Sequence, residues 1–209
     1  MNRRNVATTA FFSIAIVVLV FTASSCTKQA STGQSNRSTG QSNGSIWFVA
    51  GSHPASYSTG ITSEEHYSGK QCGFIRSKDS LIDGFGTLMQ ICRPDGYLGK
   101  KVKMTGLIKT KDIKEWAGMW MRVDGPNGVL SFDNMRDRPI RGTTYWEQHS
   151  IILDVPNTAK DMAFGILLRG TGEAYIDSVS FEVIGPASNN TNTEHSQLNS
   201  KPSNLDFEQ

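Results

Sequence analysis

The stretch "GEAYIDSVSFEVIG", residues 172–185, alternates apolar and polar residues as a strand does, but its apolar face changes sides part-way. Ala174 and Ile176 share one face, whereas the apolar residues from Val179 onward share the other. Because a strand alternates faces with a period of two, such a switch needs an extra residue, as in a β-bulge. The sequence therefore predicts a bulge at Asp177, whose carboxylate we expect to accept backbone N–H groups rather than to act in catalysis.

Short alternating stretches with turn residues between them continue this pattern over residues 46–185. No segment of ten or more residues shows a convincing 3.6-residue apolar period. Such a series of strands predicts an all-β, two-sheet β-sandwich or jelly roll. The expected strands are Ile46–Ala50, Cys72–Arg76, Phe85–Cys92, Lys101–Thr110, Trp116–Val123, Val129–Phe132, Trp146–Asp154, Met162–Arg169 and Glu173–Ile184.

The first 26 residues have the pattern of a targeting signal. Two arginines precede the apolar run Phe11–Phe21, and small residues then lead into Cys26. The run is shorter than the roughly 20 residues that a membrane-spanning helix needs. It resembles a bacterial lipoprotein signal ending at Cys26, which would carry the lipid; an ordinary secretory signal cleaved nearby is the alternative. Both interpretations predict export, and the first predicts lipid anchoring to the bacterial cell envelope.

Two polar segments border the strands. Residues 27–45 contain Ser-Thr-Gly-Gln-Ser-Asn twice, and residues 186–209 have the same polar character. Neither segment can bury enough apolar surface to offset the entropy lost on ordering. The sequence therefore predicts a disordered tether at 27–45, one β-sandwich domain at 46–185, and a disordered tail at 186–209.

Charge and cysteine content limit the partners and the covalent structure. The formal charge of +2 falls to about zero once the two arginines of the signal are removed, so we expect no nucleic-acid partner. With Cys26 assigned to the lipid, Cys72 and Cys92 form an even pair in an oxidising compartment. A Cys72–Cys92 disulfide and two buried free thiols are comparable alternatives.

No strong catalytic or metal-binding motif is present in the sequence. Gly84-Phe85-Gly86 begins like a dinucleotide fingerprint but continues as a strand. A hydrolase would need Asp133, His149 and Asp177 to converge in one cleft. A structural Ca²⁺ in the oxygen-rich segment His53–Thr62 lacks the Asp-x-Asp-x-Asp spacing. We therefore expect no enzyme activity and no cofactor.

The stretch "EWAGMWMRVDG", residues 115–125, places aromatic and basic side chains on one side of a predicted strand. Trp116, Gly118, Trp120 and Arg122 share one face, with successive positions on that face about 7 Å apart, and Met119 and Met121 share the other. Flat aromatic rings stack on the C–H faces of sugars, and arginine supplies a fork of hydrogen-bond donors. This pattern predicts a glycan-binding platform. The alternative is that the tryptophans lie in the core and the methionines on a wetter face.

A charged segment, "FDNMRDRPIRGTTYW", residues 132–146, is predicted to form a long loop. Its acidic and basic residues balance one another, which is typical of a solvated, self-paired loop. Alternatively the loop borders a binding cleft, since sites on β-scaffolds are commonly built from loops. Asp133 and Asn134, at the exit of a strand, are then the best candidates for polar contacts with a ligand.

Several of these stretches together resemble a known module. "GFGTLMQ", "WAGMWMRVDG", "FDNMRDRPIRGTTYW", "ILDVP" and "FGILLRGTGEAYIDSVSFE" are similar to a bacterial β-sandwich module appended to AraC-type transcription regulators and to some hydrolases. That module resembles galactose-binding-like, carbohydrate-binding jelly rolls. The resemblance covers residues 47–184 and implies the fold and a ligand-binding or accessory role. It does not extend to transcription, because this chain has an export signal and no helix-turn-helix pattern.

These observations predict a non-catalytic exported lipoprotein module that binds carbohydrate through Trp116, Trp120 and Arg122, with Asp133 and Asn134 at the rim. A structural or protein-interaction module of the envelope, with no small ligand, is the alternative. The expected partners are a glycan or an envelope protein, and the membrane through the lipid anchor.

Overall fold

The computed structural model describes residues 46–188 and 202–208. The predicted lipoprotein signal with Cys26 and the 27–45 tether therefore lie outside the described residues. Within the described ranges, no helix is long and apolar enough to cross a membrane. The elements are β1 (Phe48–Gly51), the 3₁₀ turn η1 (Pro54–Ser56), β2 (Tyr57–Thr62), β3 (Cys72–Ser77), β4 (Phe85–Cys92), β5 (Lys100–Gly125), β6 (Gly128–Asp133), β7 (Ile140–Val155), β8 (Asp161–Arg169) and β9 (Glu173–Pro186).

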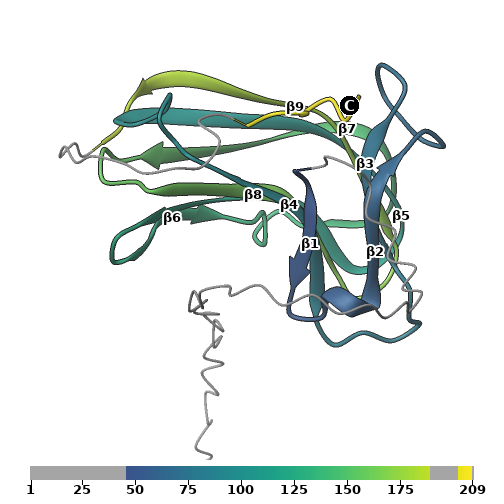
Figure 1. The fold of residues 1–209 in the computed structure, drawn as a ribbon. Coiled ribbons are helices and arrows are strands. Elements are labelled where there is room, and N and C mark those ends of the chain that lie inside the picture. The colour runs from purple at the N-terminus through teal and green to yellow at the C-terminus, as the bar shows by residue number, and fades with distance from the viewer. Residues whose placement is uncertain (1–45, 189–201, 209) are drawn as a thin grey trace, which may run out of the picture. The chain divides into compact units, whose positions relative to one another are not determined.

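The strands form one antiparallel hydrogen-bonded network, which β5 folds into two layers (Figure 1). The first half of β5 pairs with β7 on one side and β9 on the other, and β3 and β2 continue that layer, here called the β9 sheet. The second half of β5 pairs with β8 and β6, and β4 and β1 continue the β8 sheet. This arrangement confirms the predicted all-β, two-sheet sandwich.

The sequence and the structure differ where β5 turns the corner between the layers. The sequence predicts two strands with a break near 111–115, whereas β5 runs without interruption for 26 residues. Asp112 takes a left-handed backbone conformation (φ 56°), and the pairing with β7 shifts register on both sides of it. At this corner the apolar alternation fades, which is why the sequence pattern breaks there.

Two shorter segments also differ from the prediction. The oxygen-rich segment His53–Thr62, expected to be a loop, contains β2, which pairs along its whole length with β3. Its glycine, serine and threonine residues conceal the strand in the sequence. β7 begins at Ile140, so the charged loop before it is shorter than expected.

The main core lies between the two sheets. From β5 it receives Ala117, Met119, Met121 and Val123, all fully buried. The alternative in which the methionines occupy a wetter face is therefore wrong. The tryptophans of the same strand point away from this core.

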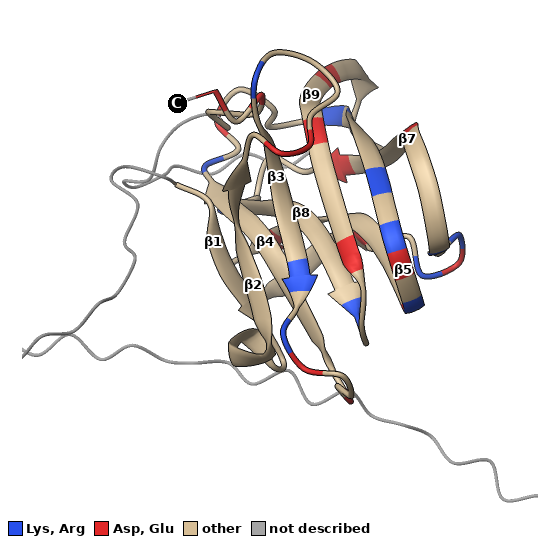
Figure 2. Cartoon of the chain, turned by 90° about the vertical axis from the view of Figure 1, so that its right-hand side faces the viewer, with Lys and Arg blue, Asp and Glu red and all other residues tan. Residues whose placement is uncertain are grey.

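On the opposite side, the exposed face of the β9 sheet carries charges of both signs, and Figure 2 shows basic positions on β5 beside acidic positions on β9. Lys111 and Glu173 approach to 3.6 Å across these two strands, and Arg76 on β3 approaches Glu173 to 3.0 Å. Opposite charges on neighbouring strands favour their register.

The predicted bulge in β9 is confirmed. Thr105 pairs with Ser180 and Leu107 pairs with Asp177, so two residues of β9 lie opposite Gly106 alone. Asp177 is fully buried, and its Oδ2 accepts the backbone N–H groups of Tyr67 (2.7 Å) and Ser68 (3.0 Å). The carboxylate therefore has the structural role that the sequence predicts.

The C-terminal segment corrects a prediction. The polar composition of 186–209 predicts a disordered tail, yet residues 202–208 pack against the domain. Phe207 is fully buried and stacks on Trp47 with ring centroids 4.8 Å apart, while Trp47 Nε1 donates to the Asn204 carbonyl oxygen at 3.0 Å. A few apolar residues within a polar segment are enough to anchor it, which average composition conceals.

Of the two alternatives for Cys72 and Cys92, the structure has the buried free thiols and not the disulfide. Cys72 begins β3 in the β9 sheet, and its Sγ donates to the Glu65 carbonyl oxygen at 2.8 Å. Cys92 ends β4 in the β8 sheet. Burial raises the pKa of each thiol to about 12, so both stay protonated at neutral pH.

The Asp177 contacts predict a large effect of a small substitution. Asp177→Ala leaves the backbone N–H groups of Tyr67 and Ser68 without their charged acceptor, and we expect the free energy of unfolding to fall by about 2–3 kcal/mol. Chemical denaturation followed by tryptophan fluorescence measures the change. Asp137→Ala, at an exposed carboxylate, is the matched control and should change stability little. Equal stability of the two variants would contradict the structural role of Asp177.

The docked C-terminal segment makes a second prediction. Phe207→Ala empties a fully buried site against Trp47, and truncation of a buried phenylalanine typically costs about 3–5 kcal/mol. Thermal unfolding should shift downward by several degrees, and a chain ending at residue 201 should show a similar loss. Glu182→Ala, at an exposed position of β9, is the control. An unchanged melting temperature in the truncated chain would mean that the segment does not stabilise the domain.

Candidate functional site

A second apolar cluster covers the outer face of the β8 sheet, the face turned away from the main core. Cross-strand register brings residues of four strands onto this face. The buried members are Met89, Trp120, Ala163 and Leu167, and Ala50, Phe85 and Trp116 surround them as partly buried members. Apolar side chains therefore cover both faces of this sheet, which is the first indication of a functional surface.

Trp120 forms the floor of this face. Its side chain is 7% exposed, and its Nε1 donates to Thr87 Oγ1 at 2.7 Å. Trp120 lies on β5 opposite Gly165 of β8, whereas Thr87 lies on β4, so the indole crosses β8 where Gly165 has no side chain. This geometry fixes the ring but leaves little of it for stacking on a ligand.

A row of three side chains crosses the end of the same face. Arg169, the last residue of β8, lies opposite Phe85 on β4 and Trp116 on β5. Neighbouring strands are about 5 Å apart, so the guanidinium stands between two aromatic residues. Both aromatic side chains are partly exposed, and so is Arg169, at 39%. We call these three residues the Arg169 row.

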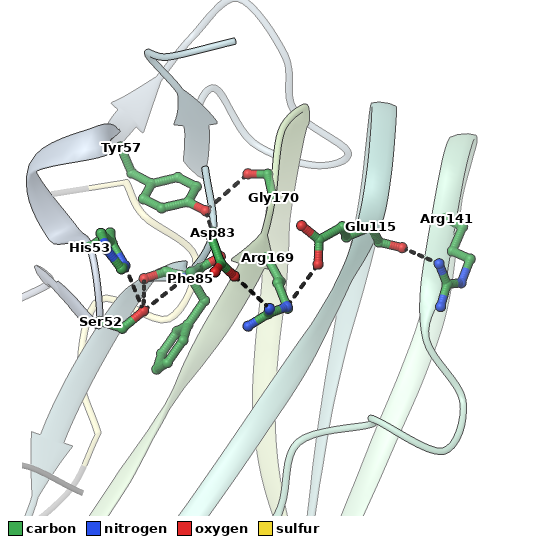
Figure 3. A network of polar contacts seen from close by, with 10 residues as sticks. Ser52, His53, Tyr57, Asp83, Phe85, Glu115, Arg141, Arg169 and Gly170 are labelled. Carbon is green, nitrogen blue, oxygen red and sulfur yellow. Dashed lines mark hydrogen bonds and ion pairs between the residues drawn. The ribbon is translucent and has the colours of Figure 1, made fainter. Parts of the chain in front are cut away.

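Two carboxylates hold the guanidinium of the row (Figure 3). Arg169 Nε donates to Glu115 Oε2 at 2.7 Å, and Nη2 donates to Asp83 Oδ1 at 3.2 Å. Arg141 Nη1 donates to the Glu115 main-chain oxygen at 2.6 Å and so fixes this part of β5. The charges around the row nearly balance.

Tyr57 hydrogen-bonds to the two turns beneath the Arg169 row. Its hydroxyl donates to the carbonyl oxygens of Gly170 (2.9 Å) and Gly84 (3.2 Å), which join the ends of β8 and β4. Burial, and secondly the negative charge of Glu115, raise the pKa of Tyr57 to about 12. The phenol therefore remains a hydrogen-bond donor at neutral pH. Ser52 similarly holds the chain after β1, because its Oγ accepts the Phe85 N–H at 3.0 Å.

The predicted site residues separate into groups. Trp116 and Asn134 border the same small space, since a methyl group on Gly118 would lie 3.4 Å from the Asn134 carbonyl oxygen and 3.6 Å from the Trp116 ring. Arg122 lies about 20 Å from Trp116 along β5, at the other end of the face. Its Nε donates to Asp124 Oδ2 at 2.8 Å. Trp116, Trp120 and Arg122 thus share one face, but they do not form one platform.

Asp133 is engaged within its own loop. Its Oδ2 accepts from Arg138 Nη2 at 2.6 Å, and its Oδ1 accepts the Met135 N–H at 2.8 Å. The self-paired loop that the charge pattern indicates is therefore present. Asp133 and Asn134 also line a shallow, open depression of about 430 Å³ beside β7, whose other lining residues are Phe132, Arg136, Asp137, Arg138 and Leu153.

The alternative catalytic constellation does not assemble. His149 lies opposite Gly106 and points to the inner face of the β9 sheet, where burial lowers its pKa. Asp177 lies opposite Leu107 on the outer face. Groups on opposite faces of one sheet cannot share a cleft, so the convergence of Asp133, His149 and Asp177 that a hydrolase would need does not occur. Among the described residues, His, Cys, Asp and Glu side chains form no group of three or more placed to hold a metal ion.

Sequence reasoning missed Phe85, Arg169, Glu115 and Asp83. Arg169 stands at the end of an apolar strand before Gly-Thr-Gly, a position that by itself indicates only a turn. Its neighbours on the face come from distant parts of the chain and become adjacent only through the pairing of β4, β8 and β5. The partly exposed Trp116 was the one signal for this end of the sheet.

Comparison of sequences relates the chain to part of a regulator. No family model matches the chain. It is 41% identical over 166 residues to an uncharacterized HTH-type transcriptional regulator, YbfP, of Bacillus subtilis strain 168. The match takes in 78% of this chain and 56% of the regulator, so the chain spans about half the length of this curated relative. The likeness agrees with the resemblance to regulator-associated modules.

Comparison with solved structures finds proteins of similar fold at low sequence identity. The enzymatically active domain of bacteriophage CBA120 tailspike protein 4 has a TM-score of 0.50 at 11% identity, over 67% of this chain and 20% of that chain. The CBM22-1 xylan-binding domain of Paenibacillus barcinonensis Xyn10C has a TM-score of 0.49 at 11% identity, over 68% of this chain and 87% of that domain. The C-terminal family 22 carbohydrate-binding module of Clostridium thermocellum Xyn10B has a TM-score of 0.47 at 15% identity, over 69% of this chain and 89% of that module. At these identities the likenesses concern the fold alone.

The end of the face opposite the Arg169 row contains two carboxylates in cross-strand register. Asp161 on β8 lies opposite Asp124 on β5. Burial, and secondly the charge of Asp124, raise the pKa of Asp161 above its ordinary value of 3.8. Like charges directly opposite one another weaken a strand pair.

This pair predicts a pH dependence. Above pH 3.8 the unfolded Asp161 is ionised while the folded one still holds its proton, so stability falls as pH rises until the folded pKa is passed. Asp161→Asn should therefore raise the melting temperature at pH 7, and the gain should shrink as the pH falls from the folded pKa toward 3.8. Thermal scans of both proteins from pH 3 to 7 measure the difference. A gain that is independent of pH would exclude titration of Asp161 as its cause.

Proposed function

We propose that the chain is a non-catalytic glycan-binding module and that its ligand lies on the Arg169 row. The observation that carries the proposal is the pair of partly exposed aromatic side chains, Phe85 and Trp116, on either side of a partly exposed arginine. Aromatic faces stack on the C–H faces of sugar rings, and a guanidinium donates hydrogen bonds to their oxygens. Asn134, beside Trp116, adds a polar group at the border.

The rigid support beneath the row favours a binding role. Trp120 is fixed by its hydrogen bond to Thr87, and Tyr57 ties together the turns that carry Arg169 and Phe85. A surface that is ordered before the ligand arrives loses less entropy on binding. The similarity of fold to carbohydrate-binding modules agrees with this proposal.

We further propose export and lipid anchoring at Cys26, which rest on the sequence pattern of residues 1–26 alone. Lipid attachment at Cys26, followed by the polar segment 27–45, would hold the module at the cell envelope, where it can meet polysaccharides. Mass spectrometry of the membrane fraction, with Cys26→Ala as the control, tests the lipid directly.

A structural or protein-interaction module is the second candidate. It is favoured by the burial of Trp120 and by the Arg122–Asp124 pair, which leave only part of the predicted platform open. Under this alternative the outer face contacts another protein and no sugar binds. The identity with part of a transcriptional regulator is compatible with either use of the module.

Removal of one indole tests glycan binding. Isothermal titration calorimetry with neutral and acidic cell-wall and plant polysaccharides should identify a ligand. Trp116→Ala should weaken the binding of that ligand at least tenfold, because the aromatic surface on which the sugar ring stacks is lost. Tyr145→Ala is the matched control, since Tyr145 is 88% exposed on β7, away from the row. Trp120→Ala should instead lower the free energy of unfolding, by the roughly 3–5 kcal/mol typical of truncating a buried tryptophan. Unchanged affinity in Trp116→Ala would contradict the proposed site.

A further inference from the structure

The two carboxylates on Arg169 differ in how firmly they are held. Glu115 accepts from Nε at 2.7 Å, lies against Gly170, and belongs to a stretch of β5 that Arg141 fixes. Asp83 accepts a single bond at 3.2 Å, and its side chain is 99% exposed. Exposed ion pairs of this kind are worth about 0–1 kcal/mol. Asp83 is therefore an exchangeable partner of Arg169, whereas Glu115 is a fixed one.

Arg169 has donors left for a ligand. A guanidinium carries five N–H groups in one plane, and the contacts described use Nε and one direction of Nη2. The side chain is 39% exposed between Phe85 and Trp116, so the remaining edge is accessible from the outer face. A second carboxylate that displaces Asp83 can accept from Nη2 and Nη1 together and so form two parallel hydrogen bonds, an arrangement stronger than the single bond to Asp83.

From this geometry we infer that the Arg169 row selects glycans that contain uronic acids. The sugar ring stacks on Trp116, and its carboxylate takes the place of Asp83 on the Arg169 guanidinium. This inference rests on the proposed glycan-binding function and adds to it the class of sugar. A neutral sugar can make the stacking contact but offers only hydroxyl groups to the guanidinium, which form weaker hydrogen bonds than a carboxylate does.

The charge balance of the Arg169 row favours replacement of the Asp83 carboxylate by the carboxylate of a ligand. When Asp83 moves into water, Arg169 remains paired with Glu115 alone. A uronate carboxylate then restores the balance without leaving a charge unpaired. Asp83 and the ligand compete for one position, so removal of the Asp83 charge should strengthen binding of acidic sugars and leave neutral sugars unaffected.

A pair of ligands that differ only in charge tests the inference. Oligomers of polygalacturonate and polyglucuronate are compared by calorimetry with the same oligomers after reduction of each carboxyl to a primary alcohol. The wild-type protein should bind the acidic oligomers at least tenfold more tightly. Arg169→Gln should abolish this preference, and Asp83→Asn should raise affinity for the acidic oligomers severalfold without changing affinity for the reduced ones.

Controls separate this effect from general electrostatics and from loss of the fold. Lys103→Gln removes one positive charge on the β9 sheet and should leave the preference unchanged. If the melting temperature shows that Arg169→Gln does not fold, the Asp83→Asn comparison decides alone, and no rise in acidic affinity overturns the inference. A preference that survives in folded Arg169→Gln also overturns it.

The inference and the proposed function can fail separately. Equal binding of acidic and reduced oligomers, or binding of other glycans only, overturns the selection of uronic acids while glycan binding stands. Absence of binding to every glycan tested overturns both.

Discussion

The course of β5 is the constraint on which the rest of the structure depends. A single strand of 26 residues forms the middle of both sheets, so every other strand is positioned by pairing with it directly or through a neighbour. A strand that serves two layers has to turn a corner, and the left-handed residue Asp112 with the register shifts around it provides that turn. The two halves of β5 then present their side chains to one shared core.

The bulge in β9 follows from the same constraint. β9 runs beside the first half of β5, and the extra residue at Ser178 restores its pairing along the strand. The bulge leaves Asp177 on the outer face, where its carboxylate takes up the N–H groups of Tyr67 and Ser68. A fully buried carboxylate is costly unless it is hydrogen-bonded, and here its acceptors are used to order a long connection between β2 and β3. The irregularity of one strand thus fixes the loop above it.

The second half of β5 creates the candidate binding surface. Its methionines fill the main core, and the tryptophans of the alternate face have to lie on the outside of the β8 sheet. One of them, Trp120, is accommodated by crossing Gly165 to reach Thr87. The other, Trp116, stays partly exposed beside Arg169. Apolar side chains at the surface with polar groups around them are typical of a ligand-binding face rather than of a plain solvated sheet.

Much of this could be predicted from local patterns. A period of two assigns the correct faces to Trp116–Val123 and reveals the bulge at Asp177, because both depend only on neighbours in sequence. The Arg169 row could not be predicted, since it arises from the register of three strands that are far apart in the chain. The docking of Phe207 and the separation of Cys72 from Cys92 were hidden for the same reason: each depends on which layer a segment joins.

Two aspartates illustrate how burial divides structural from functional charge. Asp177 has no exposed surface and two backbone donors, so its position is fixed and any exchange would leave buried groups unpaired. Asp83 is almost fully exposed with one long bond, so water or another anion can replace it at little cost. Arg169 remains held by Glu115 while Asp83 leaves, and the guanidinium therefore keeps its orientation through the exchange. Selectivity at this face then comes from the unequal hold on two carboxylates, rather than from the number of charges around the arginine.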